Sequence, residues 1–484
     1  MAATEQFDPV LSNADLNPTP IDVRNWNWYN FFALWMGMVH NIFNYSVAAG
    51  LLVLGMNAWQ ALLTILIGNL ILLVIIVLNA EFGLRFGTPF PVAVRASFGV
   101  FGANVAALIR ALVAIGWFGI QGYLGAQALS VLIGTVLPGW HAFTVRVPVL
   151  GISLNLLAAV IVYWILFGLV VFHGMDAVKR FENWAGPSVL ILMLFLFGWA
   201  LKSAHGFGPI YSQPSHFAGI GFWPAFFAGI TGIIGAFATI GLNIPDFTRF
   251  AVSRKDHILG QTLGLPLMQL LFAILAVTIT SATIVVYHHA IWDPVTLIQK
   301  FKSPVIVFLG ALILMVATLS VNVAANIVSP AYDLSNLAAK HINFKRGALI
   351  TLIVAFVIMP WRLLVNANTI YDILDVAGAA IAPATAIMIV DFWLIRKQHI
   401  VTQELYSRHG IYRYYKGWNW RALVCLAVGL FLGGSGVLIP AFSGLYKYSW
   451  FVGLFAAGIL YAILGTVFPV AQNAPESSTA SSAS

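Results

Sequence analysis

The sequence predicts an all-α integral membrane protein with twelve transmembrane helices. Of its 484 residues, 60% are hydrophobic and only 8% are charged, whereas soluble proteins carry about 25% charged residues. A soluble domain of this length needs more charge to cover its surface. The composition therefore excludes a soluble enzyme, a disordered chain and a secreted disulfide scaffold. The mean hydropathy of +0.91 agrees with this interpretation.

Twelve apolar runs are each long enough for a spanning helix, which needs roughly 20 residues. They are continuously apolar, which excludes the alternating pattern of a strand barrel. The expected spans lie at about 29–54, 57–79, 102–133, 150–172, 185–202, 220–242, 260–288, 304–328, 347–364, 369–395, 420–440 and 447–468.

The two ends of the chain are polar. Residues 1–28 lack the basic and apolar regions of a signal peptide, so we expect a cytoplasmic N-terminal segment. Residues 471–484 are of low complexity, and we expect this tail to be disordered. The single cysteine, Cys425, excludes an intramolecular disulfide and a cysteine-based metal site.

Lys and Arg residues predict the orientation of the chain. About two thirds of the 24 fall in the five loops that face the cytoplasm if the N-terminus is inside. We therefore expect both termini to be cytoplasmic, in a multi-pass protein of the inner (plasma) membrane. The net charge of +8 then reflects insertion and attraction to anionic lipid, and it does not indicate a nucleic acid partner.

The first span carries a polar cluster at its centre, where His40, Asn41 and Asn44 separate two apolar halves. Polar groups at mid-depth are costly in a membrane helix, so they indicate a functional site. His40 suits either a hydrogen-bonding role or a proton relay.

The sixth span is interrupted by glycines, at Gly229, Gly232, Gly235 and Gly241. Interrupted spans at corresponding positions of two halves are typical of inverted-repeat transporters. We therefore predict five-helix repeats at 29–202 and 220–395, followed by two appended helices at 420–468. The alternative is that the glycines only permit close helix packing.

Two further spans carry polar pairs at helical spacing. Trp117 and Gln121 share one face of the third span, where an indole plane and an amide suit a flat heterocycle with amide groups. Asn322 and Asn326 share one face of the eighth span. For both pairs, packing and hydrogen bonding inside the bundle is the structural alternative.

Chemistry that the sequence lacks narrows the function. It contains neither a GxxxxGK[ST] nucleotide loop nor an HExxH pattern. We therefore expect a protein that is not an enzyme, with no catalytic residue, no metal site and no organic cofactor. Its expected partners are a small-molecule substrate and the lipid bilayer, and we expect a monomer.

Several long segments resemble the nucleobase–cation symport-1 family of permeases. They are LWMGMVHNIFNYSVAAGLL, RFGTPFPVAVRASFGVFGANVAALIRALVAIGWFGIQ, GFGPIYSQP, GIIGAFATIGLNIPDFTRF, ATLSVNVAANIVSPAYDLSN, INFKRG and SWFVG. The resemblance covers about residues 25 to 468. Within the family it is strongest to bacterial allantoin permeases, with uracil and hydantoin permeases as relatives.

The resemblance implies a LeuT-type fold with substrate held among spans one, three, six and eight. By motif, Trp117 resembles the family's ring-stacking Trp, Gln121 its amide ligand, Asn326 its span-eight Asn and Phe237 a second stacking aromatic. Residues near His40, Asn41 and Asn44 would line the same cavity, and Asn322 lies beside Asn326.

The resemblance also implies an ion-coupling site near Ala317 and Ser320. The sodium-dependent hydantoin permease of the family has hydroxyls at two neighbouring positions, where this chain has Ser320 and Val321. Valine offers no side-chain oxygen to a hard cation, so proton coupling is favoured.

The predicted function is therefore a secondary active transporter that imports a small neutral heterocycle. Allantoin coupled to protons is the first choice. The alternatives are a uracil, hydantoin or other nucleobase permease with sodium coupling, or an uncoupled channel or facilitator.

Overall fold

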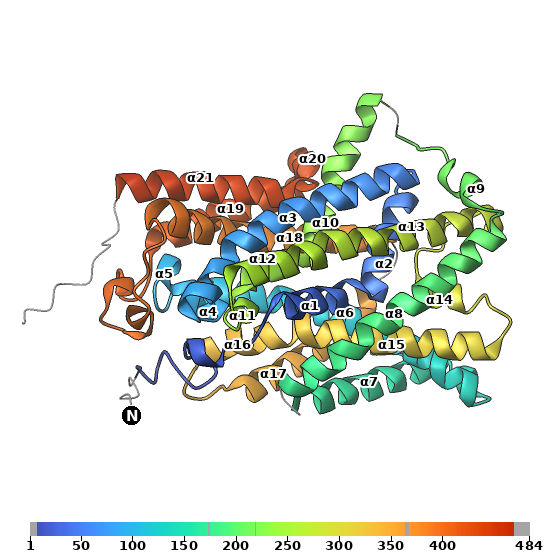
Figure 1. Cartoon of the computed structure of the whole chain (residues 1–484), viewed down its shortest axis with the longest axis horizontal. Coiled ribbons are helices and arrows are strands. Elements are labelled where there is room, and N and C mark those ends of the chain that lie inside the picture. The colour runs from blue at the N-terminus through green and yellow to red at the C-terminus, as the bar shows by residue number, and fades with distance from the viewer. Residues whose placement is uncertain (1–6, 173–174, 218, 364–366, 469–484) are drawn as a thin grey trace, which may run out of the picture.

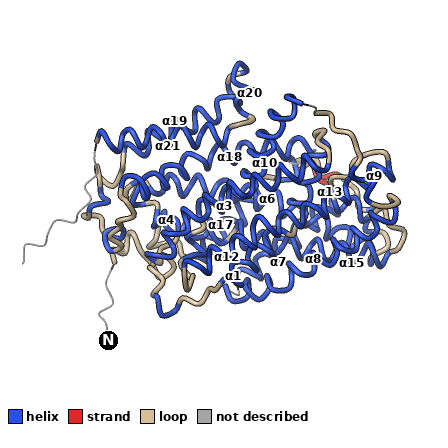
Figure 2. Tube along the Cα trace, turned by 45° about the horizontal axis from the view of Figure 1, so that its top comes forward, coloured by secondary structure: helices blue, strands red, loops and turns tan. Residues whose placement is uncertain are grey.

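The computed structural model describes residues 7–172, 175–217, 219–363 and 367–468. Most helices run along the long axis of the molecule, and the described chain begins and ends near the same end of the bundle (Figure 1). Loops gather at the two ends of the helices (Figure 2). Among the described residues the sheet structure is one antiparallel pair, β1 (Arg146–Val147) and β2 (Ile152–Ser153).

The long helices coincide with the expected spans. They are α1 (Trp28–Val39), α2 (Ile42–Val53), α3 (Ala58–Phe86), α6 (Ala103–Val136), α7 (Leu154–Phe172), α8 (Met175–Ser203), α10 (Phe222–Asn243), α13 (Met268–Tyr287), α15 (Pro304–Asn326), α17 (Phe344–Val357), α18 (Ala367–Val390), α19 (Trp420–Leu438) and α21 (Ser449–Val467).

Shorter helices lie at the ends of the bundle or extend the long ones. They are α4 (Phe90–Ala93), α5 (Arg95–Phe98), α9 (Phe207–Tyr211), α11 (Pro245–Thr248), α12 (Arg254–Thr262), α14 (Pro294–Ile298), α16 (Val328–Leu337) and α20 (Ser443–Tyr446).

The predicted membrane protein is confirmed. Within the described residues, nine helices are long and apolar enough to cross a bilayer, and the bent pair α1 and α2 makes a tenth. The two other expected spans coincide with α7 and α8, whose apolar parts are shorter. The count of twelve, the two repeats and the appended pair therefore stay predictions, and the tail at 471–484 lies outside the described residues.

Side chains set the starts of several spans. Asn27 and Asn30 form a capping box at α1, and Asn57 and Gln60 form another at α3. In each case the cap side chain accepts a hydrogen bond from a backbone N–H that the helix leaves free. The helix α3 ends at Phe86 and is capped by Gly87, whose φ of 67° is the left-handed conformation that favours glycine.

The expected interruption of the sixth span is wrong. Helix α10 runs unbroken from Phe222 to Asn243. Its glycines serve close packing instead, because a Cβ on Gly235 would lie 2.5 Å from the Leu374 carbonyl oxygen and one on Gly229 would lie 2.7 Å from Thr64. These contacts let α10 approach α3 and α18, as small residues do in membrane bundles.

Two long helix pairs organise the interior around the expected site. Helix α6 packs along α15, and α10 packs along α3. The broken span α1–α2 lies between these pairs, since α1 contacts α15 while α2 contacts both α6 and α10. The polar residues expected to act together are therefore carried by helices that touch.

Candidate functional site

The polar cluster of the first span is a helix break, as expected. Helices α1 and α2 meet at 61°, and His40 and Asn41 lie between them. The Asn41 side chain begins α2 by accepting a hydrogen bond from the Asn44 backbone N–H at 3.0 Å. The break thus has a local cause, because an asparagine at this position favours a new helix start over continuation of α1.

The carbonyl groups released by the break are bound within the same span. The Asn41 amide donates to the Met38 carbonyl oxygen at 2.6 Å. The Asn44 amide donates to the carbonyl oxygens of Met38 at 3.2 Å and Val39 at 2.9 Å. These buried asparagines therefore supply the partners that the bilayer cannot.

His40 is buried at the break and is only half satisfied. Its Nδ1 lies 2.6 Å from the Met36 carbonyl oxygen, and its ring meets Phe272 edge-on with centroids 5.1 Å apart. Its Nε2 has no hydrogen-bond partner. One ring nitrogen therefore holds the side chain in place while the other is left for a ligand or a proton.

Trp117 and Gln121 lie on the buried face of α6, one turn apart. Phe43, at the start of α2, packs against the Trp117 ring with centroids 4.9 Å apart. The indole Nε1 of Trp117 and the amide Oε1 of Gln121 are buried without hydrogen-bond partners. A buried donor and a buried acceptor thus stand unpaired on one helix face, which is unusual in proteins and suits a polar ligand.

Asn322 and Asn326 are both buried on α15 and bind each other. The Asn326 amide donates to Asn322 Oδ1 at 2.7 Å, and the Asn322 amide donates to the Phe118 carbonyl oxygen of α6 at 2.9 Å. The pair therefore forms an interhelical bond next to Trp117. This arrangement also fixes the direction in which each amide presents its oxygen.

Phe237 belongs to a second aromatic group. It is buried on α10, and its ring meets Trp35 of α1 edge-on with centroids 5.6 Å apart. Trp35 Nε1 has no hydrogen-bond partner. Sequence reasoning missed Trp35 and Phe43, although both flank the polar cluster of the first span and an aromatic beside such a cluster is a usable signal.

The expected ion-coupling residues face inward. Ala317 and Ser320 are buried on α15, and Ser320 Oγ has no hydrogen-bond partner. Val321 next to it is also buried and contributes no oxygen. Helix α15, which carries these residues, packs against α1. At the helix break that follows α1, the Met38 and Val39 carbonyls already accept amide hydrogen bonds.

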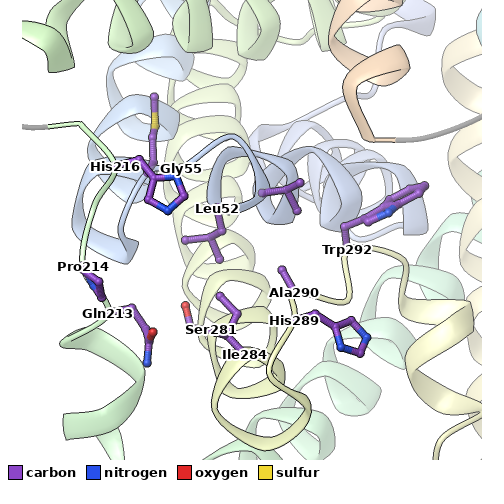
Figure 3. Close-up of a pocket in the computed structure, with 12 residues that line it drawn as sticks. Leu52, Gly55, Gln213, Pro214, His216, Ser281, Ile284, His289, Ala290 and Trp292 are labelled. Carbon is purple, nitrogen blue, oxygen red and sulfur yellow. The ribbon is translucent and has the colours of Figure 1, made fainter.

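A pocket of about 560 Å³ opens beyond this region, at the ends of α2 and α13. Figure 3 shows His216 beside Gly55 on one side and Ala290, His289 and Trp292 on the other. None of the expected site residues lines it. Thr280, next to the lining residue Ser281, donates a hydrogen bond to the Tyr45 hydroxyl at 3.0 Å, which ties α13 to α2. The pocket is therefore lined by residues other than those that the sequence pattern indicated.

Comparison with known proteins decides the family. The sequence pattern of a permease family for cytosine/purines, uracil, thiamine and allantoin matches residues 18–453. The chain belongs to the nucleobase–cation symport-1 permeases. As a member of this family it is a membrane transporter of small molecules and not an enzyme.

Individual relatives agree along nearly the whole chain. An allantoin permease of Bacillus subtilis is 44% identical, covering 98% of this chain and 97% of that protein. A purine–uracil permease of Arabidopsis thaliana is 37% identical over 95% of this chain and 78% of that protein.

A solved structure supports the fold of this permease. It is a nucleobase–cation-symport-1 family transporter in a closed conformation with bromovinylhydantoin bound. The two are 25% identical with a TM-score of 0.78, covering 95% of this chain and 97% of that one. The expected LeuT-type fold is thereby confirmed.

Proposed function

We propose that this permease imports allantoin together with protons across the inner membrane, with both termini in the cytoplasm. The similarity to the Bacillus subtilis allantoin permease supports this substrate. A monomer without a nucleic acid partner is part of the same proposal. The observation that carries it is the buried face of α6, where Trp117 and Gln121 keep an unpaired donor and an unpaired acceptor.

The chemistry of this face matches an amide-bearing ring. The flat ring of allantoin would stack on Trp117, with Phe237 as the second wall. Its ring amide N–H would donate to Gln121 Oε1. The carbonyl of its ureido side chain, which extends beyond the stacked ring, would accept from the indole Nε1–H at the edge of Trp117. Asn326 and Asn322 would form hydrogen bonds with the opposite edge of the allantoin ring. The cavity would be lined at the helix break by His40, Asn41 and Asn44.

A competition panel tests the substrate. Labelled allantoin uptake should be blocked by unlabelled allantoin more strongly than by hydantoin, uracil or adenine. The expected differences are modest for hydantoin and larger for the others, because a site that binds amide groups rejects analogues whose donors and acceptors do not match. If uracil or a hydantoin competes better than allantoin, that compound replaces it as the proposed substrate.

Proton coupling is favoured over sodium by the groups around Ala317 and Ser320. A hard cation prefers several oxygen ligands. Val321 supplies none, and the carbonyls of Met38 and Val39 at the break in the first span already accept hydrogen bonds from asparagine amides. A proton needs only one basic group, so proton coupling does not require several oxygen ligands at this site.

Ion replacement checks the coupling. Replacing sodium by choline at fixed pH should leave allantoin uptake unchanged, while collapse of the proton gradient should abolish accumulation. Strict dependence on sodium would contradict proton coupling. Equilibration without accumulation under any ion gradient would instead favour the uncoupled facilitator.

A further inference from the structure

A charged cluster that no predicted site includes is buried where four helices meet. Arg110 comes from α6, Asn243 from the end of α10, Asp246 from α11, and Ser329 and Asp333 from α16. None of these side chains is more than 2% exposed. A charge at such a site is costly unless it is paired and hydrogen-bonded.

The two carboxyl groups of the cluster differ in their partners. Asp246 accepts hydrogen bonds from the Phe90 backbone N–H at 2.8 Å and from the Asn243 amide at 3.0 Å. Such donors favour the ionised form of a carboxyl group. Burial nevertheless raises the pKa of Asp246, although Arg110, Ser329, Phe90 and Asn243 all act to lower it.

Asp333 has no such donors. Neither of its carboxyl oxygens has a hydrogen-bond partner, although the side chain is completely buried. Its nearest cation is Arg110, with Nη1 3.7 Å from Oδ2, beyond hydrogen-bond distance. Of the two carboxyl groups, Asp333 is therefore the one for which the neutral, protonated form is favoured.

Charge balance within the cluster points the same way. One guanidinium faces two carboxyl groups, so two ionised aspartates would leave an uncompensated negative charge in the interior. Arg249 lies over the ring of Tyr332 at 5.6 Å but donates its hydrogen bonds to the Thr19 hydroxyl and the Asp15 backbone carbonyl oxygen.

The other charged groups near α16 in the described residues are bound elsewhere or exposed. Arg95 of α5 is buried and donates to Asn336 Oδ1 of α16, but its other hydrogen bonds go to the carbonyl oxygens of Leu405 and Leu11. Neither α4 nor α15 contains a titratable residue, and Lys345 and Arg346 of α17 are exposed. One bound proton would therefore bring the cluster to neutrality.

Hydrogen bonds connect the cluster to the helices that carry the proposed substrate site. Arg110 Nη2 donates to Asn243 Oδ1 at 2.9 Å and to the Ala325 carbonyl oxygen at 3.3 Å. Ala325 precedes Asn326, where α15 ends and α16 begins after Ile327. The same guanidinium therefore contacts the end of α10 and both sides of the joint in the eighth span.

We propose that Asp333 binds the coupling proton of this permease. The inference rests on the proposed proton coupling. A protonated Asp333 leaves Arg110 balanced by Asp246 alone. When the proton leaves towards the cytoplasm, the carboxylate attracts Arg110 and draws it from Ala325 and Asn243. Proton release is thereby coupled both to the backbone next to Asn326 and to the contact between α6 and α10.

Purified transporter in proteoliposomes tests this inference. Wild type should take up protons on addition of allantoin, recorded by a pH-sensitive dye, and should accumulate allantoin under an imposed pH gradient. Asp333→Asn mimics the neutral carboxyl group. It should still exchange labelled for unlabelled allantoin, but proton uptake and gradient-driven accumulation should fall to background.

Two variants complete the experiment. Asp372→Asn makes the same change at an exposed position of α18 and should behave like wild type. Asp333→Glu keeps a titratable group and should retain proton uptake with a shifted pH midpoint. If Asp333→Asn does not fold, the pH midpoint of Asp333→Glu tests the inference instead.

Three outcomes would overturn the inference. One is accumulation by Asp333→Asn at the wild-type level. Another is an unchanged pH midpoint in Asp333→Glu. In both of these, proton coupling itself still holds. If wild type takes up no protons with any heterocycle, proton coupling fails, and the role of Asp333 fails with it.

Discussion

Replacing Asp391 by alanine is expected to destabilise this permease by about 3–5 kcal/mol, because a buried ion pair loses one partner. Asp391 Oδ2 lies 2.7 Å from Arg396 Nε, and neither side chain is more than 2% exposed. Its carboxylate also accepts hydrogen bonds from the Tyr461 hydroxyl at 2.8 Å and from Ser97 at 3.1 Å. One carboxylate thus joins the segment that follows α18 to α5 and α21, and its removal leaves the guanidinium buried without a counter-charge.

Thermal unfolding of the purified protein measures this effect. The matched control is Asp8→Ala, which breaks an ion pair with Arg408 whose side chain is 45% exposed. That change should cost at most about 1 kcal/mol, since exposed pairs contribute little. Equal shifts in unfolding temperature for the two variants would show that burial of the Asp391–Arg396 pair is not what matters.

Trp117→Ala should weaken allantoin binding by roughly 30-fold or more, equivalent to about 2 kcal/mol, because a buried aromatic anchor is lost. The indole offers both a stacking plane and the unpaired Nε1 donor. Trp117→Phe keeps the plane and loses only the donor, so its loss of affinity should be smaller.

Equilibrium binding of labelled allantoin to purified protein measures the loss. Trp59→Ala serves as the control, because Trp59 is 65% exposed and lies outside the proposed site. Unfolding temperatures are recorded alongside, since removal of Trp117 also frees the Phe43 ring. Wild-type affinity in a folded Trp117→Ala variant would reject the stacking role.

The spans and the break in the first of them could be predicted for a physical reason. A bilayer offers no water to backbone groups, so each crossing must be a long apolar helix, and a polar cluster inside one must serve a purpose. Asn41 both marks that cluster in the sequence and begins α2 in the structure. The glycines of the sixth span led to a wrong prediction of a helix break, because glycine occurs both where helices pack closely and where a helix is interrupted.

The candidate site could be predicted only along single helices. A spacing of four places Trp117 with Gln121 and Asn322 with Asn326, and the structure shows both pairs buried. Contacts between distant segments, such as Phe237 with Trp35, carry no periodic signal. Residue type therefore indicated which side chains matter, but not which neighbours they meet.

Composition and helical periodicity are local properties of the sequence, and they were enough to predict a membrane-embedded bundle of apolar helices with a few buried polar faces. Which polar residues bind one another depends on the tertiary structure. In the structure, Trp117 Nε1 and Gln121 Oε1 have no hydrogen-bond partner, whereas Asn326 donates a hydrogen bond to Asn322. The tertiary structure also brought Arg110, Asp246 and Asp333 together from three segments. The physical reason is that hydrogen bonds and charge balance depend on distances in space, which residue spacing sets only within one helix.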